Sequence, residues 1–495
     1  MRRLLARLGV RHGYHISVAR DFSIYSSVNI VSLVLLLGTA VVLRRYLGPL
    51  LAGIWITLEV LPNYAQYAHL GVLNSAERDL PYLLGARRIE EFDRRKHTLF
   101  WLTHGLGALL AVTLAAGALL FRSRIATPQL FVGLLVYAPL VWLQILAAYY
   151  VVLFRARKRF VILSTRQGIS NLTKAGLTMA GGYLFGLYGV FAALLTAGIV
   201  QVALFHSALD ERFARVFDRR ILWPMIVAGL PMLAGGVAFE TIRNADRFVI
   251  LRVFGLETLG VYSVVPIICQ GVFYFPNTLS LVMFPRFQER YGETQDPESL
   301  RRFIEIPLHV LGDSLLAAIA VLFVALPPAL TAFLPDYTAS ITPLRYMLLG
   351  TYFLCLSPPA GQFLITIHKQ VQVLSFVVPS MALALAAAYV GASRGLVGVT
   401  AGIVLACLVH FVGINVYAFS CLGGAVGAAR PLAEVGVKAV VVLAVVGLID
   451  RFVPAGPTVI AVVGGWRLLA VVIVTLPLLL NAVRRVRTLS AGFVR

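Results

Sequence analysis

Residues 42–55 read VLRRYLGPLLAGIW, and residues 249–262 read VILRVFGLETLGVY. In each copy an apolar run ends, a short loop follows, and another apolar run begins. Two glycines flank each loop at a five-residue spacing, Gly48 with Gly53 and Gly255 with Gly260. Such a repeat predicts a fold of two similar halves that run in the same direction.

The composition places this repeat in a membrane. Of 495 residues, 59% are hydrophobic and only 13% are charged, and the mean hydropathy is +0.86. Soluble domains carry about 25% charged residues. Continuous apolar runs of about 18 or more residues are typical of membrane helices, whereas barrel strands alternate. The sequence therefore predicts an all-α polytopic membrane protein and excludes a soluble enzyme of ordinary size.

About fourteen transmembrane helices fit the apolar runs. Their expected limits are 22–43, 51–76, 98–121, 129–154, 161–185, 189–208, 222–253, 258–284, 305–332, 339–367, 371–392, 396–420, 435–450 and 457–482. The repeat divides them into two pseudo-symmetric six-helix lobes plus a C-terminal helix pair, a common transporter plan. A second pair of similar turns, GLYGV at 186–190 and GLVGV at 395–399, supports this, although Gly-rich turns are common between membrane helices.

The expected parts are a basic cytoplasmic N-terminus at 1–21, an N-lobe at 22–210, a C-lobe at 222–421, the helix pair at 432–483 and a cytoplasmic tail at 484–495. The net charge is +21, with 43 Lys and Arg against 22 Asp and Glu. Most of the basic residues fall in alternate loops, which predicts that these loops and both termini are cytoplasmic. We therefore attribute the positive charge to topology and expect no nucleic acid.

The sequence contains no motif for binding a metal or a cofactor. The four cysteines, Cys269, Cys355, Cys407 and Cys421, lie in or at the end of apolar runs without metal or pairing spacing. No nucleotide-binding G-x-x-x-x-G-K-[ST] motif is present. We expect no metal, no disulfide, no cofactor and no catalytic residue.

Ionisable residues inside membrane spans are the candidates for function, because they are costly there and usually face the bundle interior. Arg166 and Lys174 lie on one stripe of the fifth span, with Asn171 between them. Arg243 and Arg247 lie on one face of the seventh span with Glu240 and Asn244, and Asp246 is adjacent. Further polar positions are Glu59, Asn63, Gln66, Gln270 and Asn277.

One central cavity shared by the lobes is the simplest geometry for these stripes. Its four cations, Arg166, Lys174, Arg243 and Arg247, outnumber the acids Glu59, Glu240 and Asp246. A surplus of cations favours an anionic substrate, and arginine suits phosphate in particular. The alternative is internal salt bridging, in which the acids neutralise the arginines and the stripes only pack.

Four segments together resemble the Wzx-like oligosaccharide flippases of the multidrug/oligosaccharidyl-lipid/polysaccharide exporter superfamily. They are LGPLLAG at 47–53, NADRFVILRVFGLETLGVYS at 244–263, MFPRF at 283–287 and LPDYTASITPLRYMLLG at 334–350. The resemblance covers the chain to about residue 420. It implies a V-shaped pair of six-helix lobes that moves undecaprenyl-diphosphate-linked glycans to the outer leaflet by alternating access. The extra helix pair resembles that of the lipid II flippase branch.

On this basis we expect a flippase for cell-surface polysaccharide biosynthesis in the bacterial inner membrane. The diphosphate or acidic sugars would be held by Arg166, Lys174, Arg243 and Arg247. The polar cavity would be lined by Asn63, Gln66, Asn171, Asn244, Gln270 and Asn277. An ion would be coupled, or the arginines paired, by Glu59, Glu240 or Asp246. Two alternatives remain, a multidrug or organic-cation antiporter of the same superfamily and a membrane glycan polymerase or ligase. The expected partners are the bilayer, the lipid-linked glycan and other polysaccharide-assembly membrane proteins, and the expected oligomeric state is a monomer.

Overall fold

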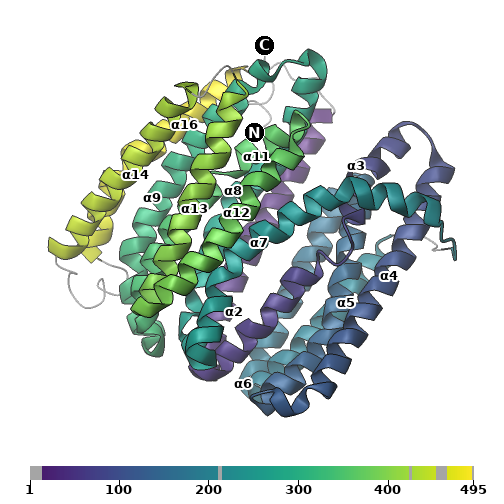
Figure 1. Ribbon diagram of the computed structural model, residues 1–495, viewed down its shortest axis with the longest axis horizontal. Helices are drawn as coiled ribbons and strands as arrows, with labels where there is room; N and C mark the ends of the chain where they lie inside the picture. The colour runs from purple at the N-terminus through teal and green to yellow at the C-terminus, as the bar shows by residue number, and fades with distance from the viewer. Residues whose placement is uncertain (1–13, 210–213, 423–425, 453–464, 493–495) are drawn as a thin grey trace. The chain divides into compact units, whose positions relative to one another are not determined.

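The computed structural model describes residues 14–209, 214–422, 426–452 and 465–492, and these ranges contain helices and no strand (Figure 1). The helices are α2 (Tyr14–Ala65), α3 (Val72–Gly85), α4 (Ile89–Leu120), α5 (Pro128–Ala156), α6 (Phe160–Ser207), α7 (Arg219–Tyr262), α8 (Val264–Thr294), α9 (Arg301–Phe333), α10 (Ile341–Cys355), α11 (Pro358–Thr366), α12 (Gln370–Gly391), α13 (Gly395–Ser420), α14 (Val426–Phe452) and α16 (Gly465–Gly492). Short 3₁₀ turns are η1 (Arg122–Arg124), η2 (Pro297–Leu300), η3 (Pro335–Ser340) and η4 (Ala392–Arg394). The predicted all-α class is confirmed.

Within these ranges, ten helical stretches are long and apolar enough to cross a membrane. Several hold two predicted spans each, such as Phe160–Ser207 for the fifth and sixth and Gln370–Ser420 for the eleventh and twelfth. The eighth span is represented by a shorter apolar helix, Val264–Tyr274. The total of fourteen spans therefore stays a prediction, while the polytopic architecture is clear.

The repeated glycines mark the bends between paired spans. Gly48 has φ 71° and ψ 173°, and its counterpart Gly255 has φ 84° and ψ −174°. The second pair of turns behaves alike, with φ 59° and ψ −142° at Gly186 and φ 73° and ψ −160° at Gly395. This backbone region is essentially open only to glycine. The two copies of each turn thus share a conformation as well as a sequence.

The partner glycines of the first repeat allow two backbones to touch. A Cβ placed on Gly53 would lie 1.9 Å from the carbonyl oxygen of Leu256, and one on Gly260 would lie 1.7 Å from that of Pro49. Each turn therefore packs its second glycine against the backbone of the other turn. No larger residue fits at either position without moving a main chain.

The predicted second span, 51–76, is wrong at its C-terminal end. Helix α2 stops at Ala65, and α3 begins only at Val72. The chain turns at Gly71, which has φ 78°, and a Cβ there would lie 2.5 Å from the carbonyl carbon of Gly229. The segment 66–71 reads QYAHLG, so its polar residues Gln66 and His69 already weaken the predicted span, and its turn brings Gly71 against the backbone of α7.

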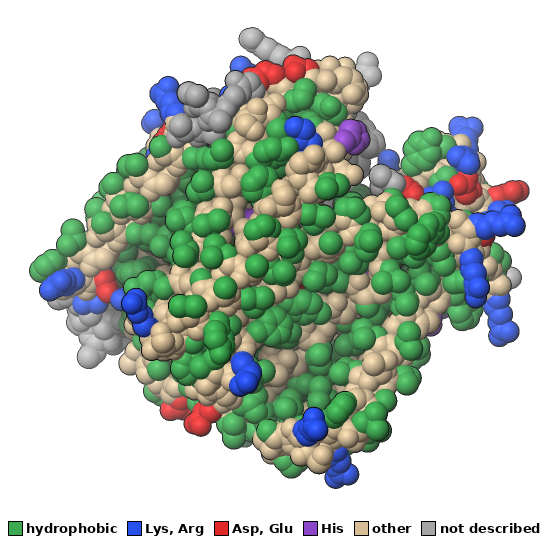
Figure 2. All heavy atoms as spheres, viewed as in Figure 1, with side chains coloured by type: hydrophobic (Ala, Val, Ile, Leu, Met, Phe, Trp, Pro, Cys, Tyr) green, Lys and Arg blue, Asp and Glu red, His purple; other side chains and the backbone are tan. Residues whose placement is uncertain are grey.

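The chain divides into two compact units, residues 1–46 with 58–233 and residues 47–57 with 234–495. In the first unit, α5 packs against α3, α4 and α6. In the second, α12 and α13 form an antiparallel pair that continues onto α10, and α9 packs against α14 and α16. Figure 2 shows hydrophobic side chains over the visible sides of the helices, with Lys and Arg mostly near the helix ends, as expected of a membrane protein.

Two ion-pair groups tie the C-terminal helices to the rest of the second unit. Lys438 of α14 lies 3.0 Å from Asp313 of α9 and 2.9 Å from Glu434, which also pairs with Arg485 of α16 at 3.1 Å. Toward the other end of α14, Asp450 pairs with Arg345 of α10 at 2.7 Å and with Arg467 of α16 at 3.0 Å. These helices are therefore integral to the second unit.

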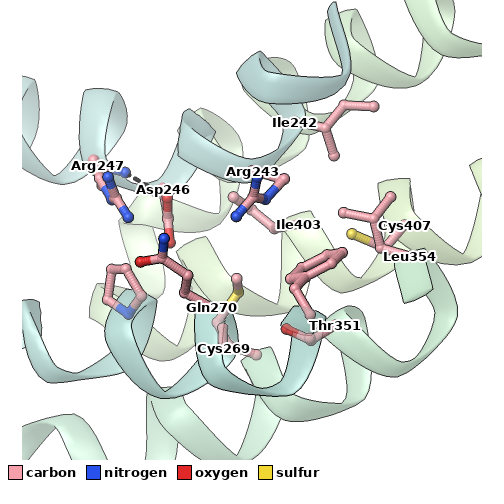
Figure 3. Close-up of a pocket in the computed structure, with 13 residues that line it drawn as sticks. Ile242, Arg243, Asp246, Arg247, Cys269, Gln270, Thr351, Leu354, Ile403 and Cys407 are labelled. Atoms are coloured by element: carbon pink, nitrogen blue, oxygen red, sulfur yellow. Dashed lines mark hydrogen bonds between the residues drawn. The ribbon is translucent and has the colours of Figure 1, made fainter. Parts of the chain in front are cut away.

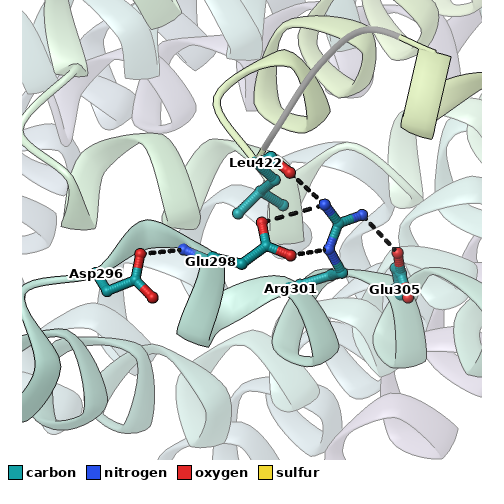
Figure 4. A network of polar contacts seen from close by, with 5 residues as sticks. All are labelled: Asp296, Glu298, Arg301, Glu305 and Leu422. Atoms are coloured by element: carbon teal, nitrogen blue, oxygen red, sulfur yellow. Dashed lines mark hydrogen bonds and ion pairs between the residues drawn. The ribbon is translucent and has the colours of Figure 1, made fainter.

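A further polar contact fixes the loop before α9. Arg301 donates to Glu298 and Glu305 and to the carbonyl oxygen of Leu422, just beyond the end of α13 (Figure 4). Asp296 caps the short turn by accepting from the backbone N–H of Glu298 at 3.0 Å. The arginine thus joins two helix ends far apart in the sequence.

Candidate functional site

Helices α7 and α8 enclose a small cavity in the second unit together with α10 and α13. Its volume is about 30 Å³, and Figure 3 shows Arg243, Asp246 and Arg247 of α7 on one side and Gln270 of α8 on the other. Apolar and cysteine side chains form most of the rest of the wall, and Thr351 adds a hydroxyl group. A space of this size holds roughly one or two water molecules. The structure thus brings together four of the predicted site residues.

Asp246 is buried, and each of its two carboxylate oxygens accepts a hydrogen bond. Tyr262 donates its hydroxyl to Oδ2 at 2.6 Å, and the backbone N–H of Arg247 donates to Oδ1 at 2.8 Å. Asp246 and Tyr262 are 1% and 0% exposed, respectively. Tyr262 ends the repeated GLETLGVY segment, but its place in the sequence gives no sign of this contact. These contacts make Asp246 a fixed acceptor that anchors the end of α7 to its middle.

Both carboxylate oxygens of Glu240 also accept hydrogen bonds. Arg243 donates to Oε2 at 3.0 Å, and the Asn244 amide donates to Oε1 at 2.8 Å. The Arg243 guanidinium also lies 4.7 Å from the centre of the Phe273 ring, within the range of a cation–π contact. The predicted internal pairing is therefore present for one of the four cations.

Arg247 differs from Arg243 in having no ion pair within the part of the chain that the structure describes. Among the described residues no carboxylate oxygen lies within 4 Å of its guanidinium nitrogens, and its buried Nε has no hydrogen-bond partner. Two arginines and one carboxyl group, Asp246, line the cavity, and Glu240 pairs with Arg243 beside it. Arg247 is therefore the lining cation that could receive an anion without breaking an ion pair in the described part of the chain.

The predicted polar stripe of α6 lies in the first unit. Arg166 is half-buried and Lys174 is exposed, and neither has an ion pair in the described part of the chain. Ser170 and Thr178, at the same four-residue spacing, are buried, and Thr178 donates to the carbonyl oxygen of Lys174 at 2.6 Å. Short side chains are covered by their neighbours, while the long cationic ones extend from the helix.

An amide chain runs beside these cations. Gln201 donates to Gln167 at 3.2 Å, Gln167 donates to Asn171 at 3.0 Å, and Asn171 donates to Ser32 of α2 at 2.8 Å. It links both halves of the kinked helix α6 to α2. Of these residues, the predicted polar cavity included only Asn171. Gln201 was missed because it lies in an otherwise apolar run with no neighbouring polar residue at helical spacing.

The remaining predicted residues are more dispersed. Glu59 and Asn63 are half-buried on α2, and Glu59 has no ion pair in the described part. Gln66 lies in the turn after α2 and donates to the carbonyl oxygen of Asn63 at 2.8 Å. The side chain of Asn277 lies outside the described residues. Because the six predicted residues from Glu59 to Lys174 belong to the first unit and the other seven to the second, the shared cavity stays a prediction.

Metal ligands do not gather in the described residues, where no group of three or more His, Cys, Asp or Glu side chains is placed to hold a metal ion. All four cysteines are free thiols, and three of them are buried. Cys269 and Cys407 line the cavity beside the arginines, where they contribute packing surface.

Structures of known proteins share this fold. The lipid II flippase MurJ in an inward closed conformation matches with a TM-score of 0.68 and 13% identity, over 95% of this chain and 99% of that one. An inward-facing multidrug resistance MATE family transporter of the MOP superfamily matches with 0.64 and 17%, over 84% and 98%. A MOP superfamily transporter from Pyrococcus furiosus, described as having a binding pocket of reverse polarity, matches with 0.60 and 17%, over 81% and 95%.

These structural relatives are described as transporters and flippases, and at 13% and 17% identity they show the fold of this chain. No protein of curated function matches the sequence significantly. The model of a family described as polysaccharide biosynthesis protein matches residues 86–335, half of the chain. The chain therefore belongs to this polysaccharide biosynthesis protein family, with the fold of the multidrug/oligosaccharidyl-lipid/polysaccharide exporter superfamily that its motifs predicted.

Proposed function

We propose that this protein flips a polyprenyl-diphosphate-linked oligosaccharide from the cytoplasmic to the outer leaflet of the bacterial inner membrane. The transport would proceed by alternating access and serve cell-surface polysaccharide biosynthesis. Family membership supports the pathway, and a fold shared with a lipid II flippase supports the type of movement. In this proposal both termini are cytoplasmic and a single chain is the working unit.

The observation that carries the proposal is the pair of arginines on α7. Arg243 and Arg247 face one cavity, and Arg247 has no ion pair among the described residues. Arg247 is half-buried, and its enclosed Nε has no hydrogen-bond partner among the described residues, so its position favours an anionic ligand that binds transiently. An arginine guanidinium can donate two parallel hydrogen bonds to a diphosphate, whereas a lysine ammonium acts as a single compact charge.

The present cavity of about 30 Å³ is too small for a diphosphate. Binding at this place therefore requires α7 or its neighbours to move, as alternating access implies. Arg166 and Lys174 of α6 would supply further positive charge during the passage, since they too have no ion pair in the described part.

The acids have separate roles in this proposal. Glu240 and Asp246 each have donors on both oxygens, so they position α7 and keep Arg243 in place. Glu59 has no such partners in the described part and is the better candidate for coupling an ion or proton. An organic-cation antiporter would instead favour a surplus of acid around its substrate.

Flipping in proteoliposomes tests the function directly. A fluorescent undecaprenyl-diphosphate trisaccharide is included in the vesicles, and a reductant that cannot cross the membrane quenches the label in the outer leaflet. Arg247→Ala is compared with Arg252→Ala, which removes an exposed arginine from the same helix. We expect wild type and Arg252→Ala to flip the lipid, and Arg247→Ala to do so about ten to a hundred times more slowly, since hydrogen bonds to charged groups contribute about 1.5–3 kcal/mol.

Absence of flipping by the wild type, with uptake of tetraphenylphosphonium into the same vesicles, would replace the flippase with the antiporter. Equal rates for all three proteins would show that Arg247 does not act on the lipid. Hydrolysis or extension of the trisaccharide would instead identify an enzyme.

A further inference from the structure

A cavity in the first unit is much larger than the cavity at α7. Its volume is about 440 Å³, within the range of about 300–1,000 Å³ typical of small-molecule sites. Its wall comes from α3, from the C-terminal half of α5, from both halves of α6 and from the turn after α2. All of these segments belong to the same compact unit.

Five side-chain amides line this cavity: Gln66, Asn74, Gln144, Gln167 and Gln201. Gln201 and Gln167 use part of their capacity on the chain that leads to Asn171. In the described part of the protein, Asn74 and Gln144 make no hydrogen bond through their amide groups. Each amide offers two donors and an acceptor with two lone pairs. The amide groups that line the cavity can therefore donate and accept several further hydrogen bonds.

The charges of the residues that line the cavity cancel. Glu77 and Arg155 both line it and pair with each other at 2.7 Å. His69 accepts a hydrogen bond on Nδ1 from the backbone N–H of Gly71 at 3.1 Å, so this nitrogen carries no proton and the ring is neutral. The lining residues offer no excess of positive charge to a diphosphate and no excess of negative charge to an organic cation. A neutral ligand rich in groups that both donate and accept is the better complement.

Sugar hydroxyl groups have this property, and the C–H faces of a sugar ring match the apolar part of the wall at Ala147, Ala148 and Val151. Resting on the proposed function, we infer that this cavity binds neutral sugar units of the glycan head group, separately from the arginines that would hold the diphosphate. Gln144 and Gln201 are the main hydrogen-bonding groups in this assignment.

The cavity extends from a helix end into the helix middle. Arg155 is in the last turn of α5, and Gln144 lies eleven residues before it, roughly 16 Å along the helix. With the predicted orientation this end of α5 is cytoplasmic. The cavity would therefore receive the sugar on the side where the lipid-linked glycan is assembled, before it crosses the membrane.

Comparing how the protein binds two lipids that differ only in the glycan distinguishes the proposed sugar site from the proposed flippase function. Native mass spectrometry follows titration with undecaprenyl diphosphate and with undecaprenyl diphosphate that carries a neutral hexose trisaccharide. The test variant is Gln144→Leu/Gln201→Leu, which keeps side-chain volume but removes the amides. The control is Gln129→Leu, at the opposite end of α5. Asn74→Ala is a second test variant that leaves the Gln201–Gln167–Asn171 chain intact.

We expect the double variant to bind the trisaccharide lipid about tenfold more weakly, since two hydrogen bonds of ordinary strength are lost. Its affinity for bare undecaprenyl diphosphate should stay within about twofold of the wild type. Asn74→Ala should show a smaller loss of the same kind, and Gln129→Leu none.

Unchanged affinity of both variants for the trisaccharide lipid would overturn the inference. So would an equal loss for both lipids, because the effect would then not depend on sugar. In either case, binding of both lipids by the wild type would leave the flippase proposal standing. Failure of the wild type to bind either lipid would instead overturn the proposed function.

Discussion

Tyr262 is the side chain whose contribution to the cavity at α7 is easiest to isolate. Its hydroxyl is the donor to Asp246 Oδ2, and both residues are enclosed. Tyr262→Phe removes one oxygen atom and leaves that carboxyl oxygen without a donor. We expect a loss of about 1–3 kcal/mol in stability, because a buried polar atom that loses its partner keeps its desolvation cost.

The measurement is thermal unfolding of the purified protein in detergent, with Tyr346→Phe as the control, since Tyr346 is 42% exposed on α10. A Tyr262→Phe melting temperature equal to that of the control variant would mean that the hydrogen bond contributes little. A decrease in stability together with normal flipping would separate the anchoring of α7 from substrate binding.

At the scale of elements, the glycine repeat makes a prediction about Gly260. A Cβ on Gly260 would lie 1.7 Å from the carbonyl oxygen of Pro49, which belongs to a helical backbone and cannot rotate away. Gly260→Ala should therefore lower the yield of folded protein, as measured by size-exclusion chromatography in detergent. Gly436→Ala on α14 should behave as the wild type, because a Cβ there meets nothing within 4 Å. Normal yield for Gly260→Ala would show that the two turns can separate at little cost.

The C-terminal helix pair makes a second prediction at this scale. Asp313 is 2% exposed and its Oδ2 has no hydrogen-bond partner, so Lys438 is its principal source of compensation. Lys438→Met should destabilise the protein by about 3–5 kcal/mol, the usual cost of leaving a buried charge unpaired. Adding Asp313→Asn should recover most of that loss.

The control for this pair is Arg430→Met, which removes an exposed cation from the same helix. Thermal unfolding in detergent compares the four proteins. If Lys438→Met and the double variant are equally destabilised, the lysine stabilises α14 through packing rather than through its charge.

For the whole molecule, the sequence predicted the class and the repeat better than it predicted the sites. Hydropathy detects helices because the bilayer imposes their length, and Gly48 and Gly255 are visible because only glycine adopts their backbone angles. The break at Gly71 and the cavity around Gln144 and Gln201 escaped prediction. At the break, Gly71 meets the backbone of Gly229, which is distant in sequence. The cavity is lined by side chains from several helices, and an isolated glutamine in an apolar run gives no periodic signal.

Orientation is the property of the whole molecule on which the order of events depends. The turn η1 and the loop that contains Lys158 lie at opposite ends of α5, which has 29 residues and spans about 44 Å. The two loops must therefore face opposite sides of the membrane. In a Cys421→Ser background, where the other natural cysteines are buried, Ser123→Cys and Lys158→Cys report the two sides.

We expect an impermeant maleimide to label Ser123→Cys in cells with a permeabilised outer membrane, and Lys158→Cys only once the inner membrane is also opened. The basic residues Arg155, Arg157, Lys158 and Arg159 favour this result, because such clusters are retained in the cytoplasm. The reverse pattern would place the amide-lined cavity at the outer face. The sugar would then bind there after crossing, and the cavity would act in release rather than in capture.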